Sequence, residues 1–216
     1  STVCVDPSYN GTGDNVAIRM ETSGVTLTAL TRGILLDVPV VLSADGVTVT
    51  GFEGTIGQAE SPSEVAAFYF DNDATNASLT FNEVVGVGSG AAVLTETGAD
   101  NSGGLIQNNV FSGAVQGIYL NPHTGSIMIR YNDFDNNVVG IAGFNGALVV
   151  ANEFGHTVPG GEAIGIDGSF DSNGGSITNN NFLDGLFINA YDGTGFGNID
   201  NTVDAENNFF STSGVA

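Results

Sequence analysis

Short hydrophobic runs alternate with polar turns along most of the chain, and the same order of residue types returns at intervals of about 20 to 32 residues. In residues 126–154, "SIMIRYNDFDNNVVGIAGFNGALVVANEF", an aliphatic run leads to Asn132 and then to Phe134. After a turn, a second aliphatic run leads to Asn152 and Phe154. This repetition predicts a chain that is built from similar short units.

An Asn-x-Phe step, or a variant of it, marks each predicted unit. The markers are Thr28-x-Leu30, Thr50-x-Phe52, Asn82-x-Val84, Asn109-x-Phe111, Asn132-x-Phe134, Asn152-x-Phe154, Asn180-x-Phe182 and Asn207-x-Phe209. An aliphatic residue usually stands three positions before the marker, and a further apolar residue follows most markers, often after Gly, as at Ile118, Ile141, Ile164 and Leu186. The segments between turns are too short for helices and rich in Val, Ile, Thr and Phe, so the pattern predicts short β-strands.

Strands of this kind can bury their apolar side by stacking coil upon coil. Successive coils would lie about 4.8 Å apart and pair in parallel around a shared core. An Asn at a fixed turn position tolerates the left-handed conformation, and its amide can bond the next coil's amide in a ladder. A Phe two residues later would stack over its counterpart, and each buried ring would contribute about 1.5 to 3 kcal/mol.

The predicted fold class is therefore all-β, a single-domain parallel β-helix of about eight coils with inserted loops. Residues 1–24 are expected to form an N-terminal partial coil, residues 25–210 the repeat coils, and residues 211–216 a C-terminal tail. The insertions fall in stretches of Gly, Asn, Asp and Ser, as expected of loops between coils. An ordinary β-sandwich with fortuitous Asn-x-Phe pairs is the alternative.

The stretches "SIMIRYNDF" and "GSITNNNF" resemble the generic repeat of the right-handed parallel β-helices of the pectate-lyase-like superfamily. The resemblance extends over residues 25–210 and implies a right-handed β-helix. Enzymes of this superfamily mostly act on acidic polysaccharides, with a site on one sheet and its flanking loops. The corresponding sheet here should contain the Gly-Ile steps. Their outward positions hold neither Lys nor Arg, although a cation ordinarily offsets the carboxylate of such a substrate.

The segment "GIYLNPHTGSIMIR", residues 117–130, is the best candidate for chemistry. It resembles the Asp-Pro-His stretch of alginate C5-epimerases, which are β-helices with a nearby Tyr and a downstream Arg. Tyr119, His123 and Arg130 match that pattern and are the candidate catalytic residues. Asn121, however, stands where the family has the aspartate, and an amide does not exchange a proton as a carboxylate does. An active lyase or epimerase is therefore an alternative rather than the leading hypothesis.

The net charge of −21 restricts the choice of partners. The chain has 24 acidic residues and three basic ones, so it should repel nucleic-acid phosphates and anionic membrane surfaces. No apolar run reaches the ~18 to 20 residues that a membrane-spanning helix needs. Such acidity suits a saline medium, which screens self-repulsion, or calcium-rich water outside the cell. An extracellular or cell-surface location is therefore expected.

Calcium is the one cofactor that the sequence suggests. Asp71, Asp73 and Thr75 place oxygen atoms at alternate positions, as a calcium loop does. The glycine and the terminal Glu of an EF-hand are missing. Solvated acidic turns on an acidic protein are the alternative interpretation.

The ends of the predicted β-helix bear on its function. Open ends expose strand edges and core side chains, and the pattern predicts no covering helix near either terminus. Phe209 and Phe210 close the last coil and are the candidate residues for an interface at this end. Either the chain continues in a larger protein or another subunit covers the end.

The leading hypothesis is a non-catalytic extracellular structural β-helix, a cell-surface, adhesin or filament-forming subunit. It would stack end to end as a homo-oligomer or in a larger surface assembly. The first alternative is a polysaccharide-binding or polysaccharide-active β-helix. The second is a segment of a viral fibre, for which a threefold axis would be expected.

Overall fold

In the computed structural model of the chain, the described residues are 2–3, 17–29, 31, 34–36, 38–55, 66–86, 90–121, 125–143, 146–155, 157–167, 175–183, 188–191 and 205–210. The regular secondary structure among them is β-strand throughout. This part of the chain contains no helix that is long and apolar enough to cross a membrane. The prediction of an all-β fold is confirmed.

The strands form three parallel sheets of eight strands each. Sheet A contains, in spatial order, β1 (Thr2–Val3), β3 (Thr26–Thr28), β6 (Thr48–Thr50), β9 (Ser78–Thr80), β12 (Leu105–Gln107), β15 (Met128–Arg130), β18 (Leu148–Val150) and β21 (Ser176–Thr178). Sheet B contains β2 (Ile18–Met20), β5 (Val40–Leu42), β8 (Ala66–Phe70), β11 (Ala91–Thr95), β14 (Gln116–Tyr119), β17 (Asn137–Ala142), β20 (Thr157–Asp167) and β23 (Ile188–Tyr191). Sheet C contains β4 (Ile34–Leu36), β7 (Phe52–Thr55), β10 (Glu83–Val85), β13 (Val110–Ser112), β16 (Asp133–Asp135), β19 (Glu153–Phe154), β22 (Asn181–Phe182) and β24 (Phe209–Phe210).

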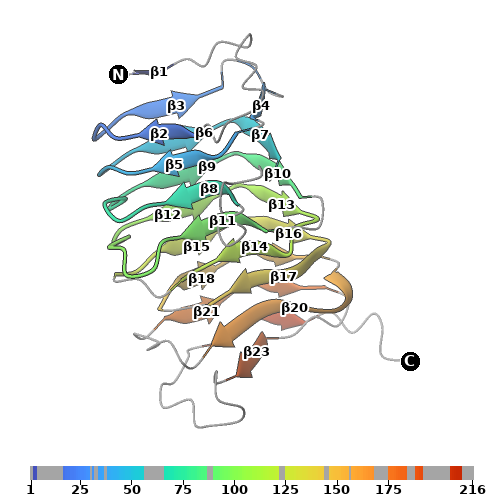
Figure 1. Cartoon of the computed structure of the whole chain (residues 1–216). Helices are drawn as coiled ribbons and strands as arrows, with labels where there is room; N and C mark the ends of the chain where they lie inside the picture. Colours follow the sequence, from blue (N-terminus) through green and yellow to red (C-terminus); the bar gives the residue numbers. More distant parts are fainter. Residues whose placement is uncertain are drawn as a thin grey trace.

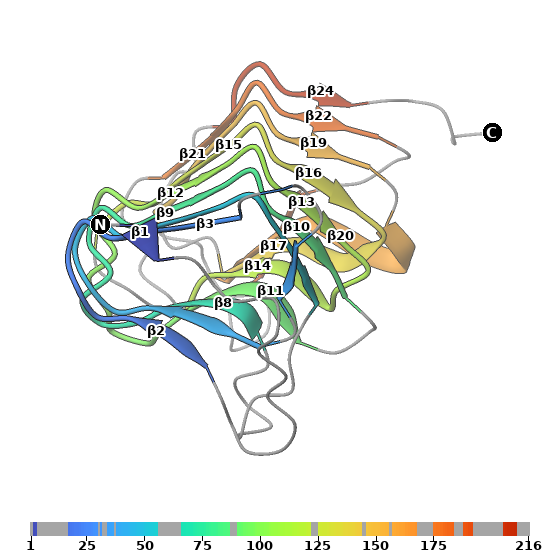
Figure 2. The ribbon, with the colours of Figure 1, turned by 90° about the horizontal axis from the view of Figure 1, so that it is seen from above.

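Each regular turn visits sheet A, then sheet C, then sheet B, and every strand pairs in parallel with the strands one turn before and after it. Figure 1 shows the coils stacked from the N-terminal to the C-terminal end. Seen from above, the strands of successive coils lie over one another around a shared interior (Figure 2). The architecture is a parallel β-solenoid, as the repeat pattern predicts, and the structure shows that it has three sheets.

A ladder of asparagine side chains joins the coils at the corner between sheet A and sheet C. Its rungs are Asn82, Asn109, Asn132, Asn152, Asn180 and Asn208. At each step, Oδ1 of the later Asn accepts hydrogen bonds from the backbone N–H and from Nδ2 of the earlier one, at 2.8 to 3.1 Å. The later Nδ2 also donates to a carbonyl of the preceding coil, as Asn132 does to Ile106 at 2.9 Å. Because a buried polar group without a partner costs about 1 to 3 kcal/mol, the ladder fixes the register of the coils.

The ladder spans five steps, so the regular part of the solenoid has about five turns rather than the eight coils that the sequence predicted. The earlier strands belong to the same three sheets but lack the Asn at this corner. Thr28 and Thr50, two predicted markers, pair with each other, and Thr50 pairs with Thr80, two residues before Asn82. Those two markers were wrong, because a Thr followed two positions later by an apolar residue also fits an ordinary strand.

The residue before each rung, rather than the rung itself, has the left-handed backbone. These corner residues have φ between 55° and 58° and are Phe81, Asn108, Tyr131, Ala151, Asn179 and Asn207. The same shift corrects the last predicted repeat, in which Asn207 is the corner and Asn208 is the rung. Phe210, not Phe209, is therefore the residue that stacks on Phe182.

The core confirms the predicted stacking of Phe and aliphatic residues. The rings of Phe134, Phe154, Phe182 and Phe210 follow one another with centroids 4.8 to 4.9 Å apart and planes within 10° of parallel. A second column lies inside sheet A and consists of Leu27, Val49, Leu79, Ile106, Ile129, Val149 and Ile177, all buried. A third lies inside sheet B, where Ile118, Ile141, Ile164 and Ile188 pair in register. Leu186, predicted for the last of these steps, lies outside the described residues.

Candidate functional site

Tyr119, the first predicted catalytic residue, lies in β14 on the outer face of sheet B. Together with Tyr69 it packs against a small cluster of buried side chains outside the main core, formed by Ala66, Ala91 and Leu94. In register, Tyr119 pairs with Leu94. The described surroundings of the Tyr119 ring are therefore largely apolar.

Arg130, another predicted catalytic residue, lies in β15 of sheet A, on a different wall of the solenoid from Tyr119. Its Nε donates a hydrogen bond to Oε1 of Gln107 at 2.6 Å, and its guanidinium lies 5.8 Å from the centroid of the Tyr131 ring. His123 lies outside the described residues. The structure therefore does not bring Tyr119 and Arg130 together, since the contacts of each lie on its own wall.

Arg19, which the repeat pattern did not place, lies in β2 of sheet B. It shares an outward column with Tyr119, so the face that was expected to be free of cations carries one near the N-terminal end. Its NH1 lies 3.7 Å from Oδ2 of Asp71. The alternation of Ile18 and Met20 indicates that Arg19 points outward, but nothing in the sequence assigned this strand to sheet B.

Asp71, the first predicted calcium ligand, follows β8 at the corner between sheet B and sheet A. Its Oδ2 accepts a hydrogen bond from the Ser43 hydroxyl at 3.0 Å, and its Oδ1 accepts one from the Asn72 N–H at 2.8 Å. Burial raises the pKa of Asp71, but hydrogen bonds with Glu96, Asn72 and Ser43 and the charge of Arg19 together lower it below its usual value. Protein groups thus already hold this carboxylate in its charged form.

Asp73 is exposed, whereas the hydroxyl of Thr75 donates to Oδ1 of Asp45 at 2.8 Å. The same oxygen accepts a hydrogen bond from Nδ2 of Asn76, and these two bonds lower the pKa of Asp45. Within the described ranges, no three His, Cys, Asp or Glu side chains are grouped so that they could hold a metal ion. Asp71 and Thr75 are engaged with different partners, and calcium binding by these residues stays a prediction.

A column in which four of the eight side chains are acidic runs along the outer face of sheet C. In spatial order its residues are Leu35, Glu53, Glu83, Val110, Asp133, Glu153, Asn181 and Phe209. Burial and the neighbouring charges of Glu153 and Asp135 raise the pKa of Asp133. The column thus stores like-charge repulsion in its middle, while its two end positions are large and apolar.

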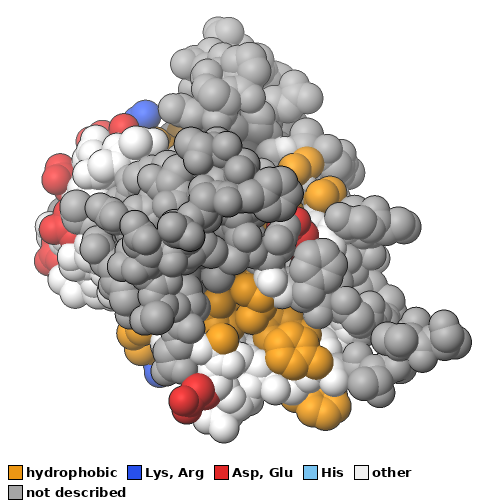
Figure 3. Space-filling view, turned by 90° about the horizontal axis from the view of Figure 1, so that it is seen from below, with side chains coloured by type: hydrophobic (Ala, Val, Ile, Leu, Met, Phe, Trp, Pro, Cys, Tyr) orange, Lys and Arg blue, Asp and Glu red, His pale blue; other side chains and the backbone are white. Residues whose placement is uncertain are grey.

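Exposed aromatic side chains lie in the last strand of sheet C, at the C-terminal end of the described stack. Figure 3 looks at the molecule from this end and shows hydrophobic side chains at the surface there. Phe210 stacks on Phe182 by one face and is 50% exposed, and Phe209 is 63% exposed. Asn208, the last rung, has no further Asn beyond it among the described residues, and its Nδ2 donates to the Ala205 carbonyl at 3.1 Å.

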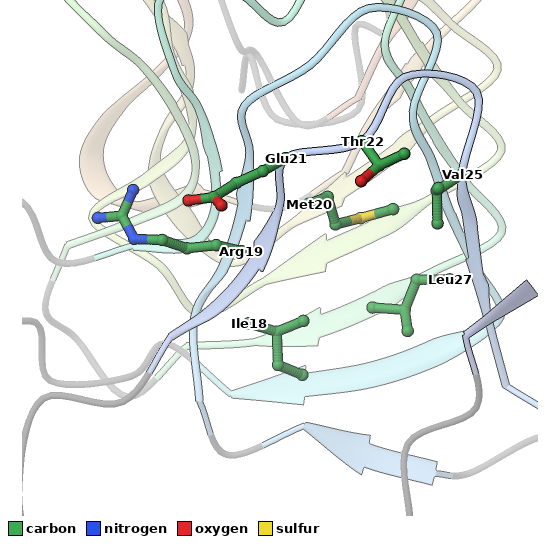
Figure 4. A pocket seen from close by; sticks show the side chains of 7 residues that line it. All are labelled: Ile18, Arg19, Met20, Glu21, Thr22, Val25 and Leu27. Carbon is green, nitrogen blue, oxygen red and sulfur yellow. The ribbon is translucent and has the colours of Figure 1, made fainter.

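The N-terminal end contains a small hollow of about 120 Å³ between β2 and β3. Its lining residues are Ile18, Arg19, Met20, Glu21, Thr22, Val25 and Leu27. The apolar side chains lie around the hollow and continue the core, whereas Arg19 and Glu21 extend to one side of it (Figure 4). Both ends of the described stack therefore present core-like side chains.

Two aromatic rings project from the corner between sheets A and C. Phe81 is 62% exposed and Tyr131 is 57% exposed, and both have a left-handed backbone. Asn108 occupies the same corner in the coil between them. A left-handed backbone costs an ordinary residue about 1 to 2 kcal/mol, so Phe81 and Tyr131, like Ala151, occupy a corner that Gly or Asn would fill at lower cost.

No family model, curated protein or solved structure matches the chain. The activity of the solenoid must therefore be inferred from its own surfaces.

Proposed function

We propose that the protein is a non-catalytic structural β-solenoid that acts outside the cell as a subunit of a surface, adhesin or filament assembly, in which copies join end to end. The observation that carries this proposal is that both ends of the described stack present apolar side chains and edge strands with no described strand beyond them. Such edges are templates for pairing with another chain unless they are covered. The proposed function is to extend a rod, not to transform a substrate.

The C-terminal end offers a surface on which another coil can be built. Phe210 is half exposed, and a further ring or aliphatic side chain could stack on it as Phe210 itself stacks on Phe182 at 4.9 Å. The rung of Asn208 likewise offers its backbone N–H in the direction in which the ladder grows. A second copy could supply the missing coil, because its first strands belong to the same three parallel sheets.

The long walls of the solenoid favour contact at the ends over contact side by side. The outer face of sheet C carries Glu53, Glu83, Asp133 and Glu153 in one column, and the net charge of the chain is −21. Like charges on facing walls repel, and the repulsion weakens as salt or calcium screens it. This supports a role in a saline or calcium-rich medium at the cell surface.

Electron microscopy and sedimentation velocity on the 216-residue chain test the proposal, at ~0.15 M and ~1 M salt and with and without calcium. Rods whose lengths are multiples of one solenoid are expected. Phe210→Asp should shorten them, whereas Phe81→Asp, an equally drastic change at an exposed ring on a side corner, should not. Dispersed single particles under all conditions would reject end-to-end assembly, and particles with a threefold axis would favour a fibre segment.

Polysaccharide binding is a second candidate, favoured by the exposed rings of Phe81 and Tyr131. The two corners are two coils apart, which corresponds to about 10 Å along the solenoid axis. Sugar rings can stack on such exposed aromatic faces, and Arg130 and Gln107 supply hydrogen-bonding groups beside Tyr131. The resemblance of the repeats to pectate-lyase-like, right-handed β-helices agrees with this candidate.

A glycan array distinguishes the two candidates. Phe81→Gly and Tyr131→Gly should abolish binding without unfolding the corner, because Gly accepts the positive φ at both positions. Ala151→Gly, the same backbone change at a corner without a ring, is the matched control. If His123→Ala removed an activity that both Gly variants retained, the lyase or epimerase alternative would gain support.

A further inference from the structure

The outer column of sheet C changes character at its two ends. Its interior positions are mostly Glu, Asp or Asn, but Leu35 occupies the first position and Phe209 the last. Leu35 is 58% exposed and Phe209 is 63% exposed. Leaving such side chains in water forgoes the free energy that burial of their apolar surface would supply. Within the described residues, large apolar side chains in this column are thus concentrated where the sheet stops.

The two residues lie on the two edge strands of one sheet. Sheet C begins at β4 and ends at β24, and no described strand lies beyond either. Each edge strand presents a row of backbone N–H and C=O groups away from the sheet. Because all strands of sheet C are parallel, a second copy displaced along the axis would continue the sheet with the same strand direction.

We propose that copies join by pairing β24 of one molecule with β4 of the next, so that Phe209 of the first lies beside Leu35 of the second. This register follows from the columns, because Phe209 and Leu35 are the two ends of one outward column. Phe210 then lies at the level of Leu36, in the inward column. A slip by one residue would turn these side chains to the wrong face of the sheet, so the apolar pattern specifies one register.

The contact is heterologous, because a tail joins a head and leaves a new tail free, so it propagates without closing. Neighbouring strands would lie about 4.8 Å apart, close enough for the side chains of Phe209 and Leu35 to touch. The inference rests on the proposed end-to-end function and adds to it the sheet and the residue pair that form the joint. The partner is a second copy of this chain.

Two single variants test the joint through complementation. Leu35→Lys places a charge on the head only, and Phe209→Glu places one on the tail only. Alone, each variant should fail to form rods at protein concentrations where the wild type forms them. In an equal mixture, each Glu tail meets a Lys head and each Phe tail meets a Leu head, so sedimentation velocity should show that alternating rods return.

Leu35→Lys mixed with Phe209→Lys is the matched control. In this mixture Phe209 of the first variant still meets Leu35 of the second, but the two remaining ends both carry Lys, so assembly should stop at heterodimers. Both positions are exposed, so circular dichroism should show the wild-type fold for every variant. The mixing is done at the lowest salt at which the wild type assembles, because salt screens the new ion pair. If each single variant still forms rods, or if the equal mixture assembles no better than either variant alone, this joint is overturned. Neither result contradicts end-to-end assembly itself. A wild type that never assembles would overturn both.

Discussion

The coils before Asn82 and the coils after it form the same corner in two different ways. In the early part, Gly51, with φ of 85°, turns the chain and Phe52 follows it into the interior. In the later part, a left-handed non-glycine residue turns the chain and a ladder Asn follows it. The early corner is hydrogen-bonded directly to the first rung of the ladder, because the N–H of Phe52 donates to Oδ1 of Asn82 at 3.0 Å.

The interior compensates for this difference. At the level where later coils place a stacked Phe, the early coil has Gly54, and the next coil has Val84. Phe52 is buried two residues earlier in the same strand. A polar ladder with a Phe stack and an apolar corner with a Gly therefore fill similar space within one fold. The difference teaches that strand pairing tolerates either corner, whereas the ladder adds a register that only Asn enforces.

The largest expected effect is the loss of a ring from the later region. Phe134→Ala should lower the free energy of unfolding by about 3 to 5 kcal/mol, because the ring is buried between Phe111 and Phe154. Val84→Ala, in the same column beside the early region, should cost distinctly less because it removes a smaller side chain. Urea unfolding measures both, and a loss below about 1 kcal/mol for Phe134→Ala would contradict the stacked register.

The next effect is the loss of a rung. Asn132→Ala leaves the N–H and Nδ2 of Asn109 without their acceptor and should lower the free energy of unfolding by about 1 to 3 kcal/mol. Asn208→Ala, at the partly exposed last rung, should cost less. Hydrogen exchange of the Asn109 amide should quicken in the first variant and not in the second. If both variants lost the same free energy of unfolding, burial of the side-chain amides would not determine how much each rung contributes to stability.

At the corner between sheets A and C, two substitutions are expected to change the stability by smaller amounts and in opposite directions. Gly51→Ala should destabilise the fold by about 1 to 2 kcal/mol, because Ala must adopt the positive φ. Ala151→Gly should instead stabilise it by up to about 1 kcal/mol, since relief of the strained φ exceeds the extra entropy of Gly in the unfolded chain. Thermal unfolding measures the melting temperature of both variants. If both variants shifted it in the same direction, the two corners would not be equivalent.

The smallest effects concern pH. The pKa of Asp133 in the fold is raised above its usual value near 3.8, so the stability from this site is greatest at low pH and falls as pH rises through the raised pKa. Asp133→Asn should therefore stabilise the protein at pH 7. The pKa of Asp45 is lowered, so its contribution is present above the usual value and is lost as pH falls through the lowered pKa. Asp45→Asn should destabilise at pH 7, and both differences should shrink at low pH in unfolding curves.

The fold was predictable where residue types repeat, and less so where they change. Asn109, Asn132, Asn152 and Asn180 recur with a Phe two positions later, and the pattern placed each of them correctly as a rung. The corners of the early coils were predicted wrongly because Thr50, which lies at an outward strand position, also fits the marker pattern. In the last coil the predicted rung was one residue too early, because Asn207 and Asn208 are adjacent in the sequence. Only the backbone conformation distinguishes the corner residue from the rung.

The candidate sites were less predictable, because they depend on which wall a residue occupies. Tyr119 and Arg130 match one family pattern in the sequence, yet they lie in different sheets, B and A. It left out Arg19, whose contact with Asp71 joins coils two turns apart. Of the two apolar residues at the ends of the outer column of sheet C, Phe209 was identified from the sequence but Leu35 was not. That column becomes visible only once the strand register is known.

The variable spacing of the ladder has an evolutionary consequence. Successive rungs are separated by 27, 23, 20, 28 and 28 residues, yet each step is bridged by the same hydrogen bonds. A segment from one rung to the next is therefore an exchangeable cassette, which unequal recombination can duplicate or delete without disturbing its neighbours. Natural selection could set the length of such a rod by copying cassettes, and vary its surface by lengthening a loop within one of them.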